Sequence, residues 1–113
     1  MQTFNLNSDE WDGTMDREGW GGKGALVGQR IGGELIGATM SEVESGDKLW
    51  PYHTHYLNEE WVIVLRGEPT LRTPEGEQVL RRVMLSAFHA ASRVRIRSST
   101  ERTRLFAYSC SPR

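Results

Sequence analysis

The feature that most constrains this chain is a pair of histidines one residue apart, followed by a glutamate and enclosed by two glycines. The pattern reads G-x6-H-T-H-x4-E-x6-G and runs from residue 46 to residue 67. Residues i and i+2 of a β-strand point to the same face of a sheet, about 7 Å apart. His53 and His55 on one strand would therefore direct both imidazoles toward one point. A turn at residues 56–59 would let Glu60 begin the next strand.

Two imidazole nitrogens and one carboxylate are a ligand set for divalent iron, manganese, zinc, nickel or copper. We therefore predict a divalent transition-metal site formed by His53, His55 and Glu60. The alternative is a polar strand face that holds no metal, because a His-x-His pair at the edge of a sheet is often simply exposed.

The rest of the sequence predicts an all-β fold. Short apolar or alternating runs, separated by glycine, proline and polar turns, indicate the strands of a sandwich or barrel. The expected strands cover residues 25–30, 34–40, 49–55, 60–65, 70–73 and 78–80. The run 61–65 is apolar throughout, which predicts a strand buried on both faces, with Glu60, Val62 and Val64 on the same side.

Length and composition predict a single cytoplasmic domain. A chain of 113 residues can bury one core but not two. Cys110 is the only cysteine, so no intrachain disulfide can form, and residues 1–5 lack the pattern of a signal peptide. No segment approaches the ~20 apolar residues of a membrane-spanning helix, so we expect no membrane contact. We expect an N-terminal segment at 1–22 and the barrel at 23–113.

The segment from Gly46 to Gly67 resembles the first conserved motif of cupins, with one additional residue before His53. The residues that follow, 68–77, are similar to small single-domain bacterial cupins, and the resemblance covers about residues 23–81. It implies a cupin-type antiparallel jelly-roll barrel, commonly a homodimer, with a metal inside the barrel.

Under this resemblance, His53, His55 and Glu60 match three metal ligands, while Glu59 is a poorer match. Gly67 matches the turn after the ligand strand. The implied function is to bind a divalent metal in the barrel and to act on or bind a small-molecule ligand, by oxygenation, isomerisation or a related reaction. A cupin without catalysis is the first alternative.

The second cupin motif, which supplies a fourth ligand from a segment with Pro, Gly, His and Asn, is absent. Residues 82–97 contain none of the glycine, proline and asparagine, and His89 is their only histidine, some six residues too early. We expect His89 to be a strand or turn residue rather than a ligand. The barrel is therefore expected to be atypical, and incomplete, after residue 82.

Arginines concentrate in the same part of the chain. Residues 1–80 carry six Lys and Arg against fourteen Asp and Glu, a charge of −8, whereas residues 81–113 carry eight against one, a charge of +7. A basic-tail protein that binds an acidic partner is the second alternative. We favour the interpretation that these arginines pair with acidic residues in the first part of the same molecule, and we do not expect nucleic acid as a partner. The arginines concerned are Arg93, Arg95, Arg97, Arg102 and Arg104.

From the abrupt change at residue 82 we predict that residues 82–113 are read out of frame. The alternative is a natural but diverged C-terminal half. In one shifted frame, each codon takes its second and third bases from the first two bases of a codon used here. From Arg82 on, that frame can spell G-D-V-V-C-F-P-R-G-x-A-G-A-H-Q-V-x-N-R-T, which resembles the missing second cupin motif. The middle bases are not free, so agreement of this length is hard to reach by chance. Such a segment would not have been selected to pack on the first part.

The nucleotide sequence tests the frame directly. We expect the shifted frame to stay open from the codon of Arg82 to beyond that of Cys110 and to encode the second motif, with its histidine across the codons of Arg95 and Ile96. Early stop codons in that frame would contradict the frameshift.

Overall fold

The computed structural model describes residues 1–17, 20–49, 59–89, 95–99 and 101–110. Within these ranges the chain forms ten strands and one four-residue helix, and no helix there is long and apolar enough to cross a membrane. The elements are β1 (Gly13–Arg17), β2 (Trp20–Ala25), α1 (Val27–Arg30), β3 (Ile36–Val43), β4 (Lys48–Leu49), β5 (Glu59–Arg66), β6 (Thr70–Thr73), β7 (Gly76–Val79), β8 (Leu85–His89), β9 (Arg95–Arg97) and β10 (Thr103–Cys110).

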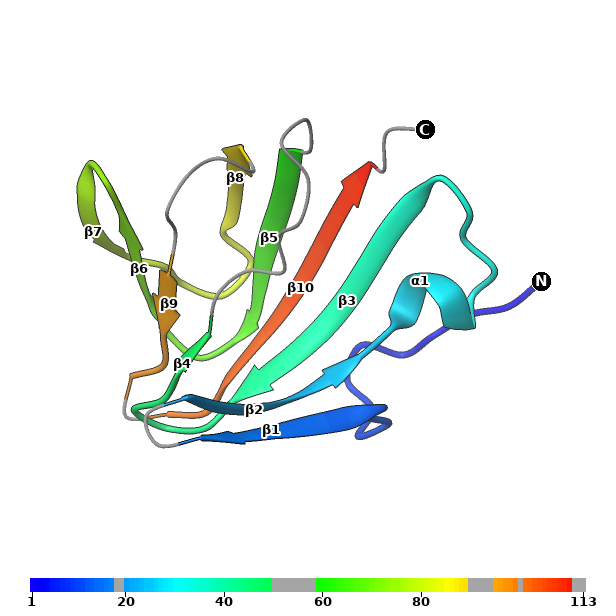
Figure 1. Cartoon of the computed structure of the whole chain (residues 1–113), viewed down its shortest axis with the longest axis horizontal. Helices are drawn as coiled ribbons and strands as arrows, with labels where there is room; N and C mark the ends of the chain where they lie inside the picture. Colours follow the sequence, from blue (N-terminus) through cyan, green and yellow to red (C-terminus); the bar gives the residue numbers. More distant parts are fainter. Residues whose placement is uncertain (18–19, 50–58, 90–94, 100, 111–113) are drawn as a thin grey trace.

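The strands form a folded sheet with the order β7-β6-β9-β4-β2-β3-β10-β5-β8, and β1 pairs with β2. All pairs are antiparallel except β2 with β4. One layer consists of β3, β10, β5 and β8, and the other contains β7, β6, β9 and β4 (Figure 1). This arrangement confirms the all-β, jelly-roll prediction.

One expected strand is wrong. Residues 25–30 were expected to be extended, but β2 ends at Ala25 and the chain turns into α1. Asp12 explains the turn, because its carboxylate accepts the Leu26 N–H at 2.6 Å and pairs with Arg30 at 2.7 Å. Gly28 lets the turn lie directly on β3, since a Cβ there would stand 2.9 Å from a β3 backbone nitrogen.

The main core lies between the two layers. It comprises Val62, Val64, Leu71, Leu80, Ile96 and Leu105, all 6% exposed or less. The predicted alternation of β5 is confirmed, because Glu60, Val62 and Val64 are all buried. The expectation that β5 is buried on both faces is wrong, since Trp61 on the other face is 38% exposed.

Gly67, which closes the first motif, is required by its backbone. Its φ is +85°, a conformation that costs little only for glycine. A Cβ at this position would also meet the carbonyl oxygen of Arg102 at 2.8 Å. The turn after β5 can therefore pass close to the start of β10 only because residue 67 is glycine.

β10 packs well, although residues beyond 82 were expected to pack poorly. It lies between β3 and β5, and Thr103, Arg104 and Leu105 are all 3% exposed or less. Its sequence alternates in the way a two-faced strand requires, with Leu105 and Ala107 on the core side. The expectation of poor packing after residue 82 is therefore wrong for this strand.

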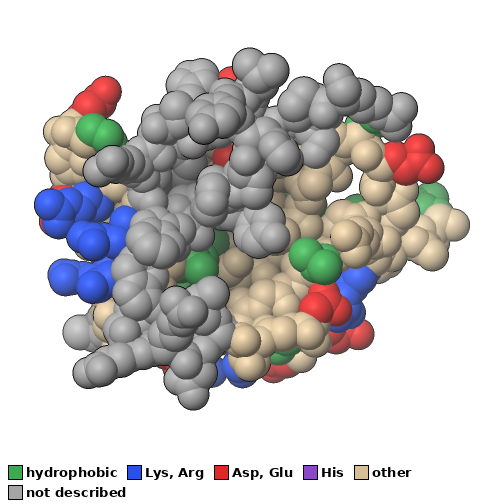
Figure 2. Space-filling model, viewed as in Figure 1, with side chains coloured by type: hydrophobic (Ala, Val, Ile, Leu, Met, Phe, Trp, Pro, Cys, Tyr) green, Lys and Arg blue, Asp and Glu red, His purple; other side chains and the backbone are tan. Residues whose placement is uncertain are grey.

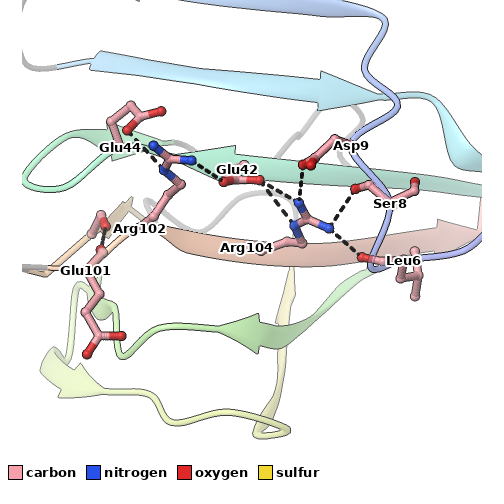
Figure 3. A network of polar contacts seen from close by, with 9 residues as sticks. Leu6, Ser8, Asp9, Glu42, Glu44, Glu101, Arg102 and Arg104 are labelled. Carbon is pink, nitrogen blue, oxygen red and sulfur yellow. Dashed lines mark hydrogen bonds and ion pairs between the residues drawn. The ribbon is translucent and has the colours of Figure 1, made fainter.

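Arg104 holds the N-terminal segment against the other face of β10 (Figure 3). Its Nε and Nη2 both donate to one carboxylate oxygen of Glu42, at 3.2 and 2.8 Å. Its Nη1 donates to the carbonyl oxygens of Leu6 and Ser8, each at 2.8 Å, and Nη2 also pairs with Asp9 at 3.1 Å. All five N–H groups of this buried guanidinium therefore have acceptors.

The segment held in this way covers a second, smaller core. Phe4, Leu6 and Trp11 pack against the buried cluster of Ala25, Val27 and Met40. The Trp11 ring also lies 5.1 Å from the Arg104 guanidinium carbon, a cation–π distance.

Arg102 binds acids as well, reaching Glu42 at 3.5 Å and Glu44 at 3.3 Å (Figure 3). For Arg102 and Arg104, the prediction that the arginines answer the acidic part of the same molecule is confirmed.

Replacing Arg104 with Gln should lower the free energy of unfolding by about 3–5 kcal/mol, because buried Glu42 would keep only its longer contact to the half-exposed Arg102. The matched change Arg102→Gln removes a half-exposed arginine and should cost about 0–1 kcal/mol. Urea unfolding followed by tryptophan fluorescence measures both. Equal losses would contradict the central role of Arg104.

Candidate functional site

Glu60 is the predicted site residue that the structure describes best. It lies near the start of β5 and is 8% exposed, on the same face as Val62 and Val64. Its Oε1 is buried and has no hydrogen-bond partner among the described residues. An acceptor buried in this way costs free energy unless a ligand, a cation or a proton satisfies it.

Burial also changes the acid–base chemistry of this carboxyl group. Desolvation disfavours the charged form and raises the pKa of Glu60 from 4.5 to about 7. A bound cation would act in the opposite direction and hold the carboxylate in its charged form. The position thus fits a metal ligand, and without a cation the group would exchange a proton near neutral pH.

The other two predicted ligands, His53 and His55, lie outside the described residues. Among the residues that are described, no group of three or more His, Cys, Asp and Glu side chains could hold a metal ion. The three-ligand site therefore stays a prediction.

His89 is the last residue of β8, and it is paired with Glu59, the first residue of β5. Phe88 is the Cα partner of Glu60. The expectation that His89 is a strand or turn residue is confirmed. Glu59 is exposed and accepts a hydrogen bond from Nε1 of Trp61, on the face opposite Glu60.

Three hydroxyl side chains share the inner face with Glu60. Directly paired residues of an antiparallel sheet project from the same face. Ser109 on β10 is the Cα partner of Glu60, and in the next row Val62 is the partner of Ser86 on β8. Ala107 on β10 is the Cα partner of both Val62 on β5 and Thr39 on β3, so Thr39 lies in the same row. All three hydroxyl residues are partly exposed.

The interior therefore changes character along the strands. Two residues beyond Val62, the row contains Val64 and Leu105, which belong to the closed apolar core. At the Glu60 end, β10 and β3 contribute Ser109 and Gly37 to the row, and Phe88 of β8 is the Cα partner of Glu60. A Cβ at Gly37 would meet nothing nearer than Ser109 Oγ at 3.8 Å. The two ends of this inner face therefore differ: one belongs to the packed apolar core, and the other carries hydroxyl groups beside Glu60.

No sequence pattern pointed to these hydroxyl residues. Ser86, Thr39 and Ser109 come from three strands distant in the chain, and serine and threonine are common in exposed strands as well. Only the register of β10 with both β3 and β5 brings them to one wall.

Several solved structures with a similar architecture are described as cupins. The chain matches a sugar phosphate isomerase of the cupin superfamily from Silicibacter pomeroyi with a TM-score of 0.77 and 18% identity, over 97% of this chain and 76% of the other. It matches an RmlC-like cupin protein from a Desulfovibrio desulfuricans subspecies with a TM-score of 0.73 and 14% identity, over 97% and 96%.

A third match is a candidate sugar phosphate isomerase from Acidithiobacillus ferrooxidans, with a TM-score of 0.71 and 24% identity over 83% of this chain. The chain spans 62% of that protein's length. No protein-family profile matches the sequence, and no curated protein is significantly similar to it. The structural matches show that this chain has the fold of a small cupin domain.

The raised pKa of Glu60 predicts how stability depends on pH without metal. Its folded-state pKa lies above the unfolded value, so its contribution is complete below pH ~4.5 and is lost as the pH rises through about 7. Glu60→Gln should remove this loss and stabilise the metal-free protein at pH 8 by up to about 3 kcal/mol. Urea unfolding with chelator at pH 5 and pH 8 measures it.

The exposed neighbour provides the matched control. Glu59→Gln should leave the difference between the two pH values unchanged. If the Glu60 and Glu59 variants behaved alike, burial would not be the cause.

Proposed function

We propose that this chain binds a divalent transition metal inside the cupin barrel through His53, His55 and Glu60, and that the site binds or converts a small polar molecule. The observation that carries the proposal is Glu60 on the strand that follows the His-x-His pair. It is a buried carboxyl group, and one of its oxygens has no hydrogen-bond partner within the described part of the chain. Carboxylate and imidazole ligands in this combination suit iron, manganese, zinc, nickel and copper.

The residues of the chain have distinct roles in this proposal. Glu60 holds the metal and, in its absence, a proton. When bound, a metal supplies Lewis-acid chemistry to an oxygen of the ligand. Ser109, Thr39 and Ser86 orient hydroxyl or carbonyl groups of the ligand, because they line the wall beside Glu60. A hydroxylated ligand agrees with the names of two similar structures, which are sugar phosphate isomerases.

A cupin that binds its ligand without catalysis is the second candidate. The absence of a second motif after residue 82 favours it, because no fourth ligand is evident in the sequence. The two candidates differ in one observation. Turnover of a hydroxylated substrate that chelator abolishes and added metal restores would establish the enzyme, and metal-dependent binding without turnover would establish the second candidate. A single cysteine fits the cytoplasmic location that we propose for either.

The metal site is tested by paired substitutions. The double variant His53→Ala/His55→Ala should reduce bound metal to background, because one carboxylate cannot hold a transition metal against water and buffer. His89→Ala should change metal content little, because its register position pairs it with Glu59. Metal analysis of protein purified without chelator, followed by titration calorimetry, measures both.

Two outcomes would contradict the assignment. A parent protein without any bound metal would favour the alternative that His53 and His55 belong to a polar strand face that holds no metal. Equal loss in the His89 variant would show that His89 supplies a nitrogen ligand.

We further propose that the chain forms a homodimer through the outer face of β5 and β8. Trp61 and Leu85 are 38% and 52% exposed, and Leu85 is the Cα partner of Ile63 beside Trp61. The ring of Tyr108 extends the apolar surface, with its centroid 5.7 Å from that of Trp61. The N-terminal segment covers β3 and the adjoining part of β10 but leaves this area open. Contiguous exposed apolar surface of this kind marks an interaction site.

Light scattering at micromolar concentration should give the mass of a dimer for the parent protein. Trp61→Glu and Leu85→Glu should each give a monomer, because a charge would be buried in the contact. Val79→Glu is the control, since Val79 is 53% exposed on β7, in the other layer. A monomeric parent, or dissociation by all three variants, would contradict the interface.

A further inference from the structure

Three arginines from neighbouring strands share one outer face of the sheet. Leu71 and Ile96 are paired and buried, so the residues on either side of them project outward. These outward residues include Arg72 on β6 and Arg95 and Arg97 on β9. We call these three residues the arginine face. Lysine and arginine side chains gather over this part of the molecule, at the left of Figure 2.

Among the residues that the structure describes, the arginine face has fewer acidic partners than Arg102 and Arg104 have. Arg72 and Arg95 are direct Cα partners, and like charges in this position destabilise a sheet. Within the described ranges, the one ion pair of the face joins exposed Arg72 to Glu77 at 3.9 Å, while Arg95 and Arg97 have none. Lys48 on β4 is the Cα partner of Arg97.

Arg102 and Arg104 show the contrast. They belong to the same arginine-rich part of the chain, but each lies within 3.5 Å of a carboxylate of the same molecule. The acidic first part of the chain thus accounts for two arginines and leaves the face formed by β6 and β9 with excess positive charge.

We propose that the arginine face binds a compact anion with several phosphate groups. One guanidinium group can donate two parallel hydrogen bonds to a phosphate. Three guanidinium groups at strand spacing can therefore contact more than one phosphate. Neighbours along β9 lie about 7 Å apart and neighbours across β6 and β9 about 5 Å apart, so the three side chains together offer room for more than one phosphate. Bound phosphates would also relieve the repulsion between Arg72 and Arg95.

The borders of the face favour a short anion over a long one. Glu75 lies in the turn before β7, and Glu77 lies on β7 directly beside β6. Both are exposed. A nucleic-acid strand that extended past Arg72 in this direction would meet these carboxylates. The occupant we infer is therefore a short oligophosphate rather than a nucleic-acid backbone.

Inorganic triphosphate is the probe for the full-length protein, with binding followed by titration calorimetry at low ionic strength. The parent should bind triphosphate at least tenfold more tightly than orthophosphate, and added salt should weaken the binding. The double variant Arg95→Gln/Arg97→Gln should lose at least tenfold in affinity, because each charge-assisted contact contributes about a factor of ten.

The control is the double variant Arg66→Gln/Arg81→Gln, which removes the same charge from exposed arginines outside the face. It should bind triphosphate like the parent, and circular dichroism should show that both double variants are folded. Equal weakening in both would show an effect of net charge only and would overturn the proposal. Absence of triphosphate binding at millimolar concentration, or tighter binding of a short oligothymidylate, would also overturn it. None of these results depends on the metal site.

Discussion

β10 joins the two sides of its layer, because it pairs with both β3 and β5. On its inner side this strand brings Ser109 beside Glu60 and Leu105 into the main core. On its outer side it carries Arg104, whose buried charge is acceptable only because Glu42 and the N-terminal backbone surround it. The candidate site and the covering of the outer face therefore both rely on one strand from the arginine-rich end of the chain.

Local patterns in the sequence were enough to predict the fold and one side of the site. Alternation in residues 60–65 placed Glu60 on the core face, and the closing glycine placed the turn after β5. The short helix in place of a strand at residues 27–30 was missed, because the cause is Asp12, fourteen residues before Leu26. The row of hydroxyl residues Thr39, Ser86 and Ser109 was missed for the same reason, since it depends on pairings between distant strands. The structure does not test the prediction for His53 and His55, because they lie outside the described residues. That prediction rests on the sequence alone.

The arginines of the C-terminal part illustrate how an unusual composition can still pack. A shifted reading frame would explain their number, but β10 needs only alternation, an apolar inner side and a charge that finds its counter-charge. Glu42 on β3 meets that last need for Arg104, and Glu44, just after β3, pairs with Arg102, just before β10. β9 finds no such acids within the described ranges, and the excess charge stays on its outer face. The same composition thus gives a neutralised strand and a charged one, according to what the neighbouring strand carries.

The way the N-terminal segment is fastened has a consequence for translation from internal start codons. A product that began at Met15 would keep β2 to β10 but lack Leu6, Ser8 and Asp9, which receive three of the hydrogen bonds of Arg104. It would also lack Phe4 and Trp11, leaving Met40 and Phe106 open to solvent next to the apolar surface of β5 and β8. Such a shortened product would be prone to aggregate, so the first eleven residues act for this chain as a built-in solubilising cover.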